Sequence, residues 1–407
     1  MVQADTPTEP PARADVFDKC GSARLEEYQI AESLGLLPFF RTVASESGPR
    51  AWIDDQEVVM LGSNNYLGLT TDPRVRKAAI DAVEEFGTGC TGSRLMNGSL
   101  PMHAELEAEL ADWLGTEGCL VFTTGYAANL GVVGTLVGQG DAMFADMGSH
   151  ASLVDGGSLA AGTVRWWRHS SPDSLRSRLR RWRDEGGGGA LVVAEGVYSM
   201  EGDEAPLPEL ATVCEEFGAR FLVDEAHSIG VVGPGGAGVA AATGVRPDLI
   251  MGTFSKALAS CGGFVAGPDR VLDYLRRSCR PFQFTASGVP ASIAAALAAA
   301  RLARAEEWRR DSLRARARQL RTGLDELGYE LGPDSGGAII PVHVGDDWDA
   351  VRLWRALLDT GVYVNCAVPP AVPGGRALLR ASVMATHEEA DIKAALNAFE
   401  VVRSTSG

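Results

Sequence analysis

Lysine is scarce in this sequence, which contains four lysines and thirty-three arginines among 407 residues. Both side chains supply positive charge, but only a lysine amine can lose its proton and form an imine with a carbonyl. Three of the lysines have ordinary surroundings. Lys19 lies in a polar N-terminal stretch, and Lys77 and Lys393 lie in charged segments with helical periodicity. These three are expected to be surface residues.

Lys256 has different surroundings from the other lysines. It follows the short apolar strand candidate at residues 249–252 and precedes the turn at Gly262 and Gly263. Taken alone, a lysine at the end of a strand is expected to reach solvent. Only further chemical groups placed around it would indicate a catalytic amine.

The sequence also lacks an excess of positive charge and any long apolar run. Its formal net charge of -16 argues against a nucleic-acid or anionic membrane partner, because such partners are usually met by a basic face. No run is long enough to span a bilayer, and the N-terminus has neither the basic nor the apolar region of a signal peptide. We therefore expect a cytoplasmic protein with small-molecule partners.

Cysteine and nucleotide motifs exclude further classes. The seven cysteines are odd in number and widely spaced, which predicts reduced thiols rather than disulfides or metal ligands, so no metal is expected. The turn at Gly125 is not a Walker loop, and no Gly-x-Gly-x-x-Gly follows the first strand. A nucleoside triphosphate or dinucleotide ligand is therefore disfavoured.

The chain is long and apolar enough, at 45% hydrophobic residues, to form one large and one smaller domain. We expect a disordered tail at residues 1–20 and an N-terminal helix with short strands at residues 21–60. A large domain at residues 61–286 and a small C-terminal α/β domain at residues 287–407 follow.

Apolar strand candidates alternate with helical patterns through the large domain. The candidates are residues 119–123, 142–144, 190–195, 220–224, 249–251 and 264–266. Strands that are apolar throughout and separated by helices indicate a mostly parallel sheet covered on both faces. In such sheets, ligands bind beyond the carboxyl ends of the strands.

Polar residues follow four of these strand candidates. Asp224 and Glu195 each end an apolar strand, His150 follows another, and Gly125 with Tyr126 opens a helix whose N-terminus can hold a phosphate. Each has a plain structural interpretation by itself. Together with Lys256 and Thr253 they match the needs of pyridoxal phosphate, which requires an imine lysine, a carboxylate for the pyridine nitrogen, an anion site and an aromatic surface.

Eight motifs carry a resemblance to a known family. They are residues 63–68, 92–98, 124–129, 149–152, 195–203, 223–227, 252–256 and 379–382. In this order they resemble the α-oxoamine synthases, which are fold-type-I enzymes dependent on pyridoxal 5'-phosphate. The resemblance implies a large domain with a mostly parallel seven-stranded sheet and a smaller C-terminal α/β domain.

The resemblance also implies roles for individual residues. Lys256 would carry the cofactor imine, Asp224 would pair with the pyridine nitrogen, and His150 would stack on the ring as a third catalytic residue. The remaining expected cofactor contacts are Gly125, Tyr126 and Thr253 at the phosphate, His227 and Ser199 at the ring hydroxyl, Glu195 and Ser255 nearby, and Thr285 of the partner subunit. Arg380 would bind the amino-acid carboxylate, and Asn64 would line the substrate side.

The implied reaction is a decarboxylative Claisen condensation. A small amino acid would react with an acyl thioester, either acyl-CoA or an acyl carrier protein, to give an α-amino ketone. Lys256 would also remove the α-proton, and Arg380 would orient the substrate. The resemblance further implies a homodimer with shared active sites.

The motifs leave the amino acid open. Residues 92–98 and 280–287 most resemble bacterial serine palmitoyltransferases, but Val368 stands where those enzymes carry an arginine, and Ala371 replaces a threonine typical of oxononanoate synthases. Serine, alanine and glycine therefore all stay possible. The Arg/Trp-rich stretch at residues 165–183 fits either a contact to the acyl donor or, more simply, a solvated helix face.

Three alternatives stay open at this stage. The first is an 8-amino-7-oxononanoate synthase-like use of alanine. The second is a fold-type-I aminotransferase, which would use the same cofactor but release a keto acid. The third is a non-catalytic subunit of a heteromeric acyltransferase, which would be expected to lack the imine lysine, so Lys256 counts against it.

Overall fold

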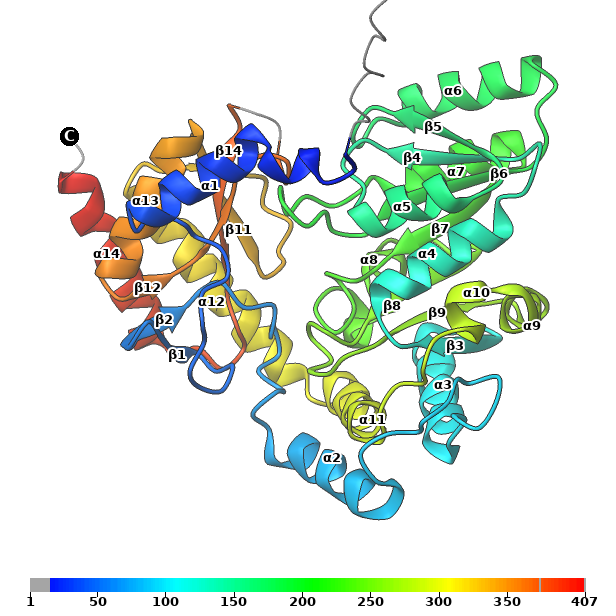
Figure 1. The fold of residues 1–407 in the computed structure, drawn as a ribbon, viewed down its shortest axis with the longest axis horizontal. Helices are drawn as coiled ribbons and strands as arrows, with labels where there is room; N and C mark the ends of the chain where they lie inside the picture. Colours follow the sequence, from blue (N-terminus) through cyan, green and yellow to red (C-terminus); the bar gives the residue numbers. More distant parts are fainter. Residues whose placement is uncertain (1–14, 373–374, 406–407) are drawn as a thin grey trace, which may run out of the picture. The chain divides into compact units, whose positions relative to one another are not determined.

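The structure is a computed structural model that describes residues 15–372 and 375–405. The chain forms two compact units, residues 1–41 and residues 42–407. In the first unit, Asp18–Gly21 form a 3₁₀ helix and Ala23–Ser33 form α1 (Figure 1). Most of the predicted disordered tail, residues 1–14, lies outside the described residues. The domain boundaries after residues 60 and 286 stay predictions, and residues 42–60 belong to the second unit.

The second unit is built around a seven-stranded sheet. Its strands, in spatial order, are β3 (Gly118–Phe122), β9 (Gly263–Gly267), β8 (Leu249–Thr253), β7 (Arg220–Asp224), β6 (Ala190–Glu195), β4 (Ala142–Asp146) and β5 (Thr163–Trp167). Only β9 runs antiparallel to its neighbours in this sheet. The predicted mostly parallel, seven-stranded sheet is therefore confirmed.

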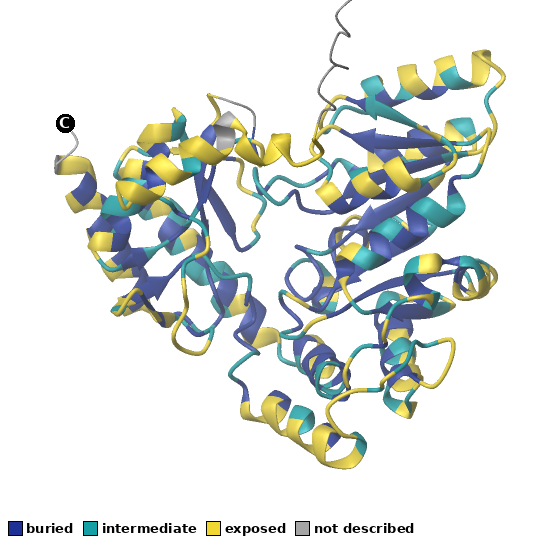
Figure 2. Cartoon of the chain, viewed as in Figure 1, coloured by how far each residue is buried: buried dark blue, intermediate teal, exposed yellow. Residues whose placement is uncertain are grey.

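Both faces of this sheet are buried, as the dark strands in Figure 2 show. On one face, strand residues such as Val193 and Leu222 pack with side chains of α4, α5 and α9 in one core cluster. Phe144, Val192 and Val223 point to the opposite face and are buried as well. This burial explains why the strands are apolar throughout rather than alternating.

Helices precede, connect and follow the strands of the large sheet. The helices before β3 are α2 (Pro73–Phe86) and α3 (Pro101–Leu114), and those after β9 are α9 (Asp269–Ser278) and α10 (Arg280–Gln283). The connecting helices are α4 (Gly125–Leu136), α5 (Ala151–Leu159), α6 (Pro172–Asp184), α7 (Leu207–Phe217) and α8 (Val239–Thr243), with a 3₁₀ turn at Pro234–Gly236. The Thr124 side chain caps α4 by accepting a hydrogen bond from Ala127 N. This cap starts α4 directly after β3, so its N-terminus faces the carboxyl edge of the sheet.

The C-terminal elements form two smaller sheets. Helices α11 (Pro290–Ala305), α12 (Glu307–Glu326), α13 (Asp347–Asp359) and α14 (Glu389–Thr405) accompany strands β10 (Glu330–Leu331), β11 (Ile339–Gly345), β12 (Val362–Tyr363), β13 (Asn365–Ala367) and β14 (Ala377–Ser382). Strands β10, β11, β14 and β13 pair in that order, whereas β12 joins β1 (Arg50–Ile53) and β2 (Gln56–Met60). Segments far apart in the chain thus share one sheet.

Strand β5 differs from the predicted pattern. Residues 165–168 belong to the Arg/Trp-rich stretch interpreted as a helix face, yet Thr163–Trp167 form the outermost strand of the sheet. An edge strand is only half covered, so it carries polar side chains that hide its strand character. Arg165 pairs with Glu185 at 2.7 Å and stacks over Trp182 at 4.5 Å. The positive charge of Arg165 is therefore balanced by Glu185 of the same chain.

Candidate active site

Residues at or just beyond the carboxyl ends of several strands line one cavity of about 240 Å³. Glu195 ends β6, Asp224 ends β7 and Thr253 ends β8, and His150 follows β4. Parallel strands place such residues side by side, as the pairing of Glu195 with Asp224 shows. Predicted site residues that line the cavity are Gly125, Tyr126, His150, Glu195, Asp224, His227, Thr253, Ser255 and Lys256.

A hydrogen-bonded chain leads from the Lys256 amine to Arg380. Lys256 Nζ lies 2.8 Å from His227 Nε2, and His227 Nδ1 lies 2.7 Å from the Tyr66 hydroxyl. That hydroxyl accepts a hydrogen bond from Arg380 Nη2 at 3.0 Å. The amine and the guanidinium therefore sit at opposite ends of one buried polar chain.

Arg380 is buried and held by three oxygens. Besides the Tyr66 hydroxyl, its Nη1 donates to Asn64 Oδ1 at 3.0 Å and its Nε donates to the Ser199 carbonyl at 2.6 Å. None of these acceptors is a carboxylate, so the positive charge of the guanidinium is not neutralised by them. A buried cation without a counter-ion is costly unless an anion binds there.

A second hydrogen-bonded chain joins Asp224 to His150. Asn129 Nδ2 donates to Asp224 Oδ2 at 2.7 Å and to Ser152 Oγ at 2.9 Å, and Ser152 Oγ lies 2.8 Å from His150 Nδ1. Asp224 Oδ1 accepts from Ala226 N at 2.9 Å. The carboxylate is thus fixed by two donors while it faces the cavity.

Burial shifts several pKa values in this cavity. It lowers the pKa of Lys256 to about 8, an effect that Asp224 and Glu195 oppose. Burial, followed by the nearby Lys256 and Arg380 charges, holds the pKa of His227 well below its ordinary value. Burial next to Asp224 raises the pKa of Glu195 well above its ordinary value. The cavity therefore favours a neutral imidazole and an amine that loses its proton easily.

Glycines make room beside the N-terminus of α4. A Cβ atom on Gly125 would lie 2.9 Å from Thr253 Oγ1, and one on Gly263 would lie 2.5 Å from Gly125 Cα. Thr253 Oγ1 and Ser255 Oγ, which lie 2.8 Å apart, stand at this end of the cavity. Backbone N–H groups, a helix N-terminus and hydroxyls together form a suitable anion site.

Some predicted residues lie apart from this cavity. Ser199 and Asn64 contact Arg380 rather than the cavity wall. Thr285 lines a different small pocket with Arg94 and His103. Its predicted contribution to the partner subunit's site stays a prediction.

The sequence analysis gave no role to three residues that belong to these two hydrogen-bonded chains. Tyr66, Asn129 and Ser152 all lie inside the quoted motifs, but nothing in their spacing shows which strand end they approach. Tyr66 and Asn129 are buried polar side chains, which is the signal that marks them once the fold is known.

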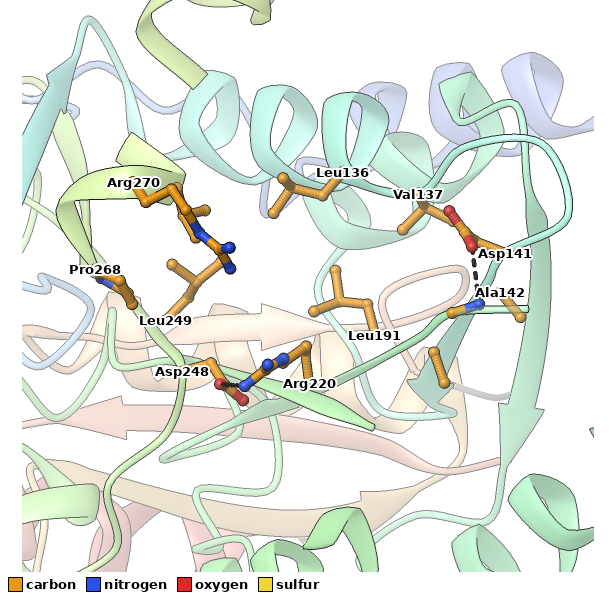
Figure 3. A pocket seen from close by; sticks show the side chains of 13 residues that line it. Leu136, Val137, Asp141, Ala142, Leu191, Arg220, Asp248, Leu249, Pro268 and Arg270 are labelled. Atoms are coloured by element: carbon orange, nitrogen blue, oxygen red, sulfur yellow. Dashed lines mark hydrogen bonds and ion pairs between the residues drawn. The ribbon is translucent and has the colours of Figure 1, made fainter. Parts of the chain in front are cut away.

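A larger cavity of about 320 Å³ lies at the opposite, amino edge of the sheet (Figure 3). Leu136, Leu191 and Leu249 contribute to its apolar wall, and Arg220 pairs with Asp248 at 2.6 Å. None of the predicted site residues lines it. Choosing the larger cavity would therefore miss the predicted catalytic residues.

Comparison with known proteins identifies the class. A model of the aminotransferase class I and II family matches residues 56–399, so the chain belongs to this family. It is 45% identical over 395 residues to a serine palmitoyltransferase from Caulobacter vibrioides, covering 96% of this chain and 97% of that protein. It is 40% identical to an 8-amino-7-oxononanoate synthase from Geotalea daltonii, covering 92% of this chain and 96% of that protein.

Solved structures agree with these relatives. A structure of serine palmitoyltransferase with the PLP internal aldimine matches with a TM-score of 0.93 at 40% identity, covering 96% of this chain and 99% of that chain. The predicted resemblance to α-oxoamine synthases, the fold-type-I architecture and pyridoxal 5'-phosphate as cofactor are thereby confirmed. The cavity fits this cofactor, since it offers the Lys256 amine, the fixed Asp224 carboxylate and the anion site at the N-terminus of α4.

The pKa of Lys256 leads to a testable pH dependence. Only the neutral amine attacks a carbonyl, and burial lowers the pKa of Lys256 to about 8. In protein freed of cofactor, the rate of covalent pyridoxal phosphate attachment should therefore rise with pH and level off above about 8. Stopped-flow absorbance across a pH series measures it. A midpoint near 10.5, the ordinary value for lysine, would contradict the buried environment.

Proposed function

We propose that this protein condenses a small amino acid with an acyl thioester and releases carbon dioxide and a thiol. Serine is the first candidate substrate, with alanine and glycine next. The observation that carries the proposal is the buried chain joining Lys256, His227, Tyr66 and Arg380. It sets a proton-accepting amine and a carboxylate-binding guanidinium at the two ends of one hydrogen-bonded chain.

Each part of the site has a defined task in this proposal. Pyridoxal phosphate, when bound, withdraws electrons from the amino-acid α-carbon. Asp224 keeps a proton on the pyridine nitrogen, and Arg380 holds the substrate carboxylate. Lys256, with its pKa lowered to about 8, moves the α-proton. His150 would cover the ring, and Thr253, Ser255 and the N-terminus of α4 would hold the phosphate.

The reaction balances without an oxidant. A bond forms between the α-carbon and the acyl carbon, the acyl carbon–sulfur bond breaks to release the thiol, and the carboxylate leaves as carbon dioxide. The product is an α-amino ketone. By keeping water away from the reacting carbon, the buried site favours attack on the thioester over hydrolysis.

Val368 bears on the choice of amino acid. It is half-buried and follows β13, whose Asn365 pairs with Arg380 across the sheet. Nearby Ala367, Val372 and Leu378 form a small apolar cluster with Met200. Val368 thus places no charged group here, and relatives named for serine and for oxononanoate synthesis make serine and alanine the two leading candidates.

A homodimer with shared active sites is part of the proposal. Ser287 N donates to the Gly92 carbonyl, so the segments 92–98 and 280–289 lie side by side. They expose the large apolar side chains of Leu95, Met96 and Phe284. Apolar groups exposed together mark an interaction surface, and Thr285 beside them supports the predicted cross-subunit contact.

We also propose a cytoplasmic location. The seven cysteines are all free thiols, which supports a reducing compartment. Within residues 15–372 and 375–405, no helix combines the length and apolar character needed to cross a bilayer.

The function is tested by measuring thiol release. Serine, alanine and glycine are each incubated with acyl-CoA of several chain lengths and with acyl carrier protein, and a thiol reagent and mass spectrometry follow the products. We expect one free thiol per α-amino ketone formed, with serine most active. Amino transfer to a keto acid without thiol release would instead identify an aminotransferase and overturn the proposal.

A further inference from the structure

His169 lies between two loops that reach the active site. It follows β5 at the outer edge of the sheet. One loop, residues 146–150, carries His150 and is here called the His150 loop. The other, residues 196–206, carries Ser199 and is called the Ser199 loop. The two loops follow different strands, β4 and β6, and His169 contacts both.

The His150 loop is built around the His169 ring. Asp146, fully buried, accepts hydrogen bonds from Gly148 N at 2.7 Å and Ser170 N at 2.8 Å, and its Oδ1 lies 2.8 Å from His169 Nδ1. A Cβ atom on Gly148 would lie 2.7 Å from His169 Nδ1. The turn that leads to His150 therefore packs directly against the imidazole and leaves no room for a side chain at position 148.

The Ser199 loop contacts the other side of the same ring. His169 Nε2 lies 3.0 Å from Asp203 Oδ2, and the Tyr198 ring meets the imidazole edge-on at 4.4 Å. Tyr198 N donates to the Asp203 carbonyl at 2.9 Å, which closes the loop. The next residue, Ser199, accepts from Arg380 through its carbonyl. The position of this loop thus sets one of the three contacts of Arg380.

The contacts of His169 with Asp146 and Asp203 are here called the His169 bridge, and a positive charge on the imidazole strengthens them. Hydrogen bonds to Asp146 and then to Asp203 raise the pKa of His169 to about 10, against the opposing effect of burial. The imidazolium then donates from both nitrogens, one to each carboxylate. Charge-assisted hydrogen bonds of this kind are about twice as strong as neutral ones.

We infer that His169 is a positioning residue that fixes the His150 loop relative to the Ser199 loop, and so aligns the cofactor-covering imidazole with the carboxylate-binding guanidinium. The inference rests on the proposed function, because it assigns His150 and Arg380 their tasks there. The hydrogen bond from His150 N to Glu195 also ties the His150 loop to β6. Loss of His169 should therefore shift the alignment without abolishing it.

The test uses the His169→Gln variant of the holoenzyme. An error of about 1 Å in alignment can cost about 10²-fold in rate, so we expect kcat/KM to fall about 10- to 100-fold. The fall should include a higher KM for the amino acid and a changed induced circular dichroism of bound pyridoxal phosphate. A role confined to folding would move neither signal below the melting temperature.

Further variants distinguish the contact of His169 with Asp203 from its contact with Asp146. Asp203→Ala removes the hydrogen bonds from His169 Nε2 and from Ser170 Oγ (3.2 Å) to the Ser199 loop but keeps the contact of His169 with Asp146, so it should raise the amino-acid KM while leaving the cofactor dichroism close to wild type. The His169→Gln and Asp203→Ala effects on KM should be non-additive, because both remove the same link. His343→Gln is the matched control, since His343 meets the Ser199 loop only through Glu201 at 3.6 Å.

Clear results would overturn the inference. They are a His169→Gln enzyme with a lower melting temperature but unchanged dichroism and amino-acid KM, or additive effects in the double variant. If His169→Gln does not fold, Gly148→Ala replaces it, because its Cβ atom would displace the imidazole, and the same unchanged signals would count against the inference. Failure of the wild type to bind pyridoxal phosphate or an amino acid would instead overturn the proposed function.

Discussion

Replacing Lys256 with alanine is expected to abolish covalent attachment of pyridoxal phosphate and to lower kcat by at least about 10³-fold. Among the described residues that line the cavity, Lys256 alone carries a primary amine, which can both form an imine and accept the α-proton. Borohydride reduction followed by mass spectrometry measures the attachment. Pyridoxal phosphate should still bind non-covalently, because the substitution leaves the anion site at the N-terminus of α4 unchanged.

Matched lysine and arginine variants make this result specific. Lys393→Ala removes an exposed lysine of α14 and should leave attachment and rate unchanged. Lys256→Arg keeps a positive charge but cannot form an imine, so it should fail as completely as the alanine variant. A reducible cofactor adduct that persists in Lys256→Ala would refute the assignment of Lys256.

Replacing Asp224 with asparagine should lower kcat by about 10²- to 10³-fold while the protein stays folded. The amide keeps the shape of the side chain, but it cannot stabilise a proton on the pyridine nitrogen. Asp224 faces the cavity between fixed donors, Asn129 at 2.7 Å and Ala226 at 2.9 Å, so these contacts hold its carboxylate in one position. Steady-state thiol release and the absorbance of the bound cofactor measure the effect.

A cofactor analogue provides the control for Asp224. Pyridoxal phosphate methylated at the pyridine nitrogen carries its positive charge permanently, so it should restore part of the lost rate in Asp224→Asn. Glu225→Gln is the protein control. Glu225 is equally buried but binds Val239 N and Ala240 N away from the cavity, and its loss should lower stability without changing the cofactor spectrum. No rescue by the methylated analogue would argue against the electrostatic role of Asp224.

The large sheet could be predicted because each buried strand is apolar along its whole length. Ala190–Glu195 and Arg220–Asp224 have the predicted bounds. Strand β5 was missed because its half-exposed residues include Arg165. In the C-terminal part, helices α11 and α12 meet at Glu306, where the backbone leaves the helical conformation.

The candidate site was predictable where it depends on strand ends. Lys256, Asp224, Glu195 and Thr253 follow apolar strands, and parallel pairing places such residues at one edge. Arg380 and Tyr66 could not be placed in this way. They lie 314 positions apart in the chain, and their hydrogen bond depends on how β14 packs beside the loop after β2.

The sequence by itself indicated the class of chemistry, because a rare lysine, strand-end polar residues and eight motifs in order together match the needs of one cofactor. It also determined the sheet, because burial on both faces requires apolar strands. Only the tertiary structure decided how the groups are tuned. Burial lowers the pKa of Lys256, and contacts between distant segments hold Arg380 and join His169 to two loops. Local sequence encodes neither burial nor such contacts.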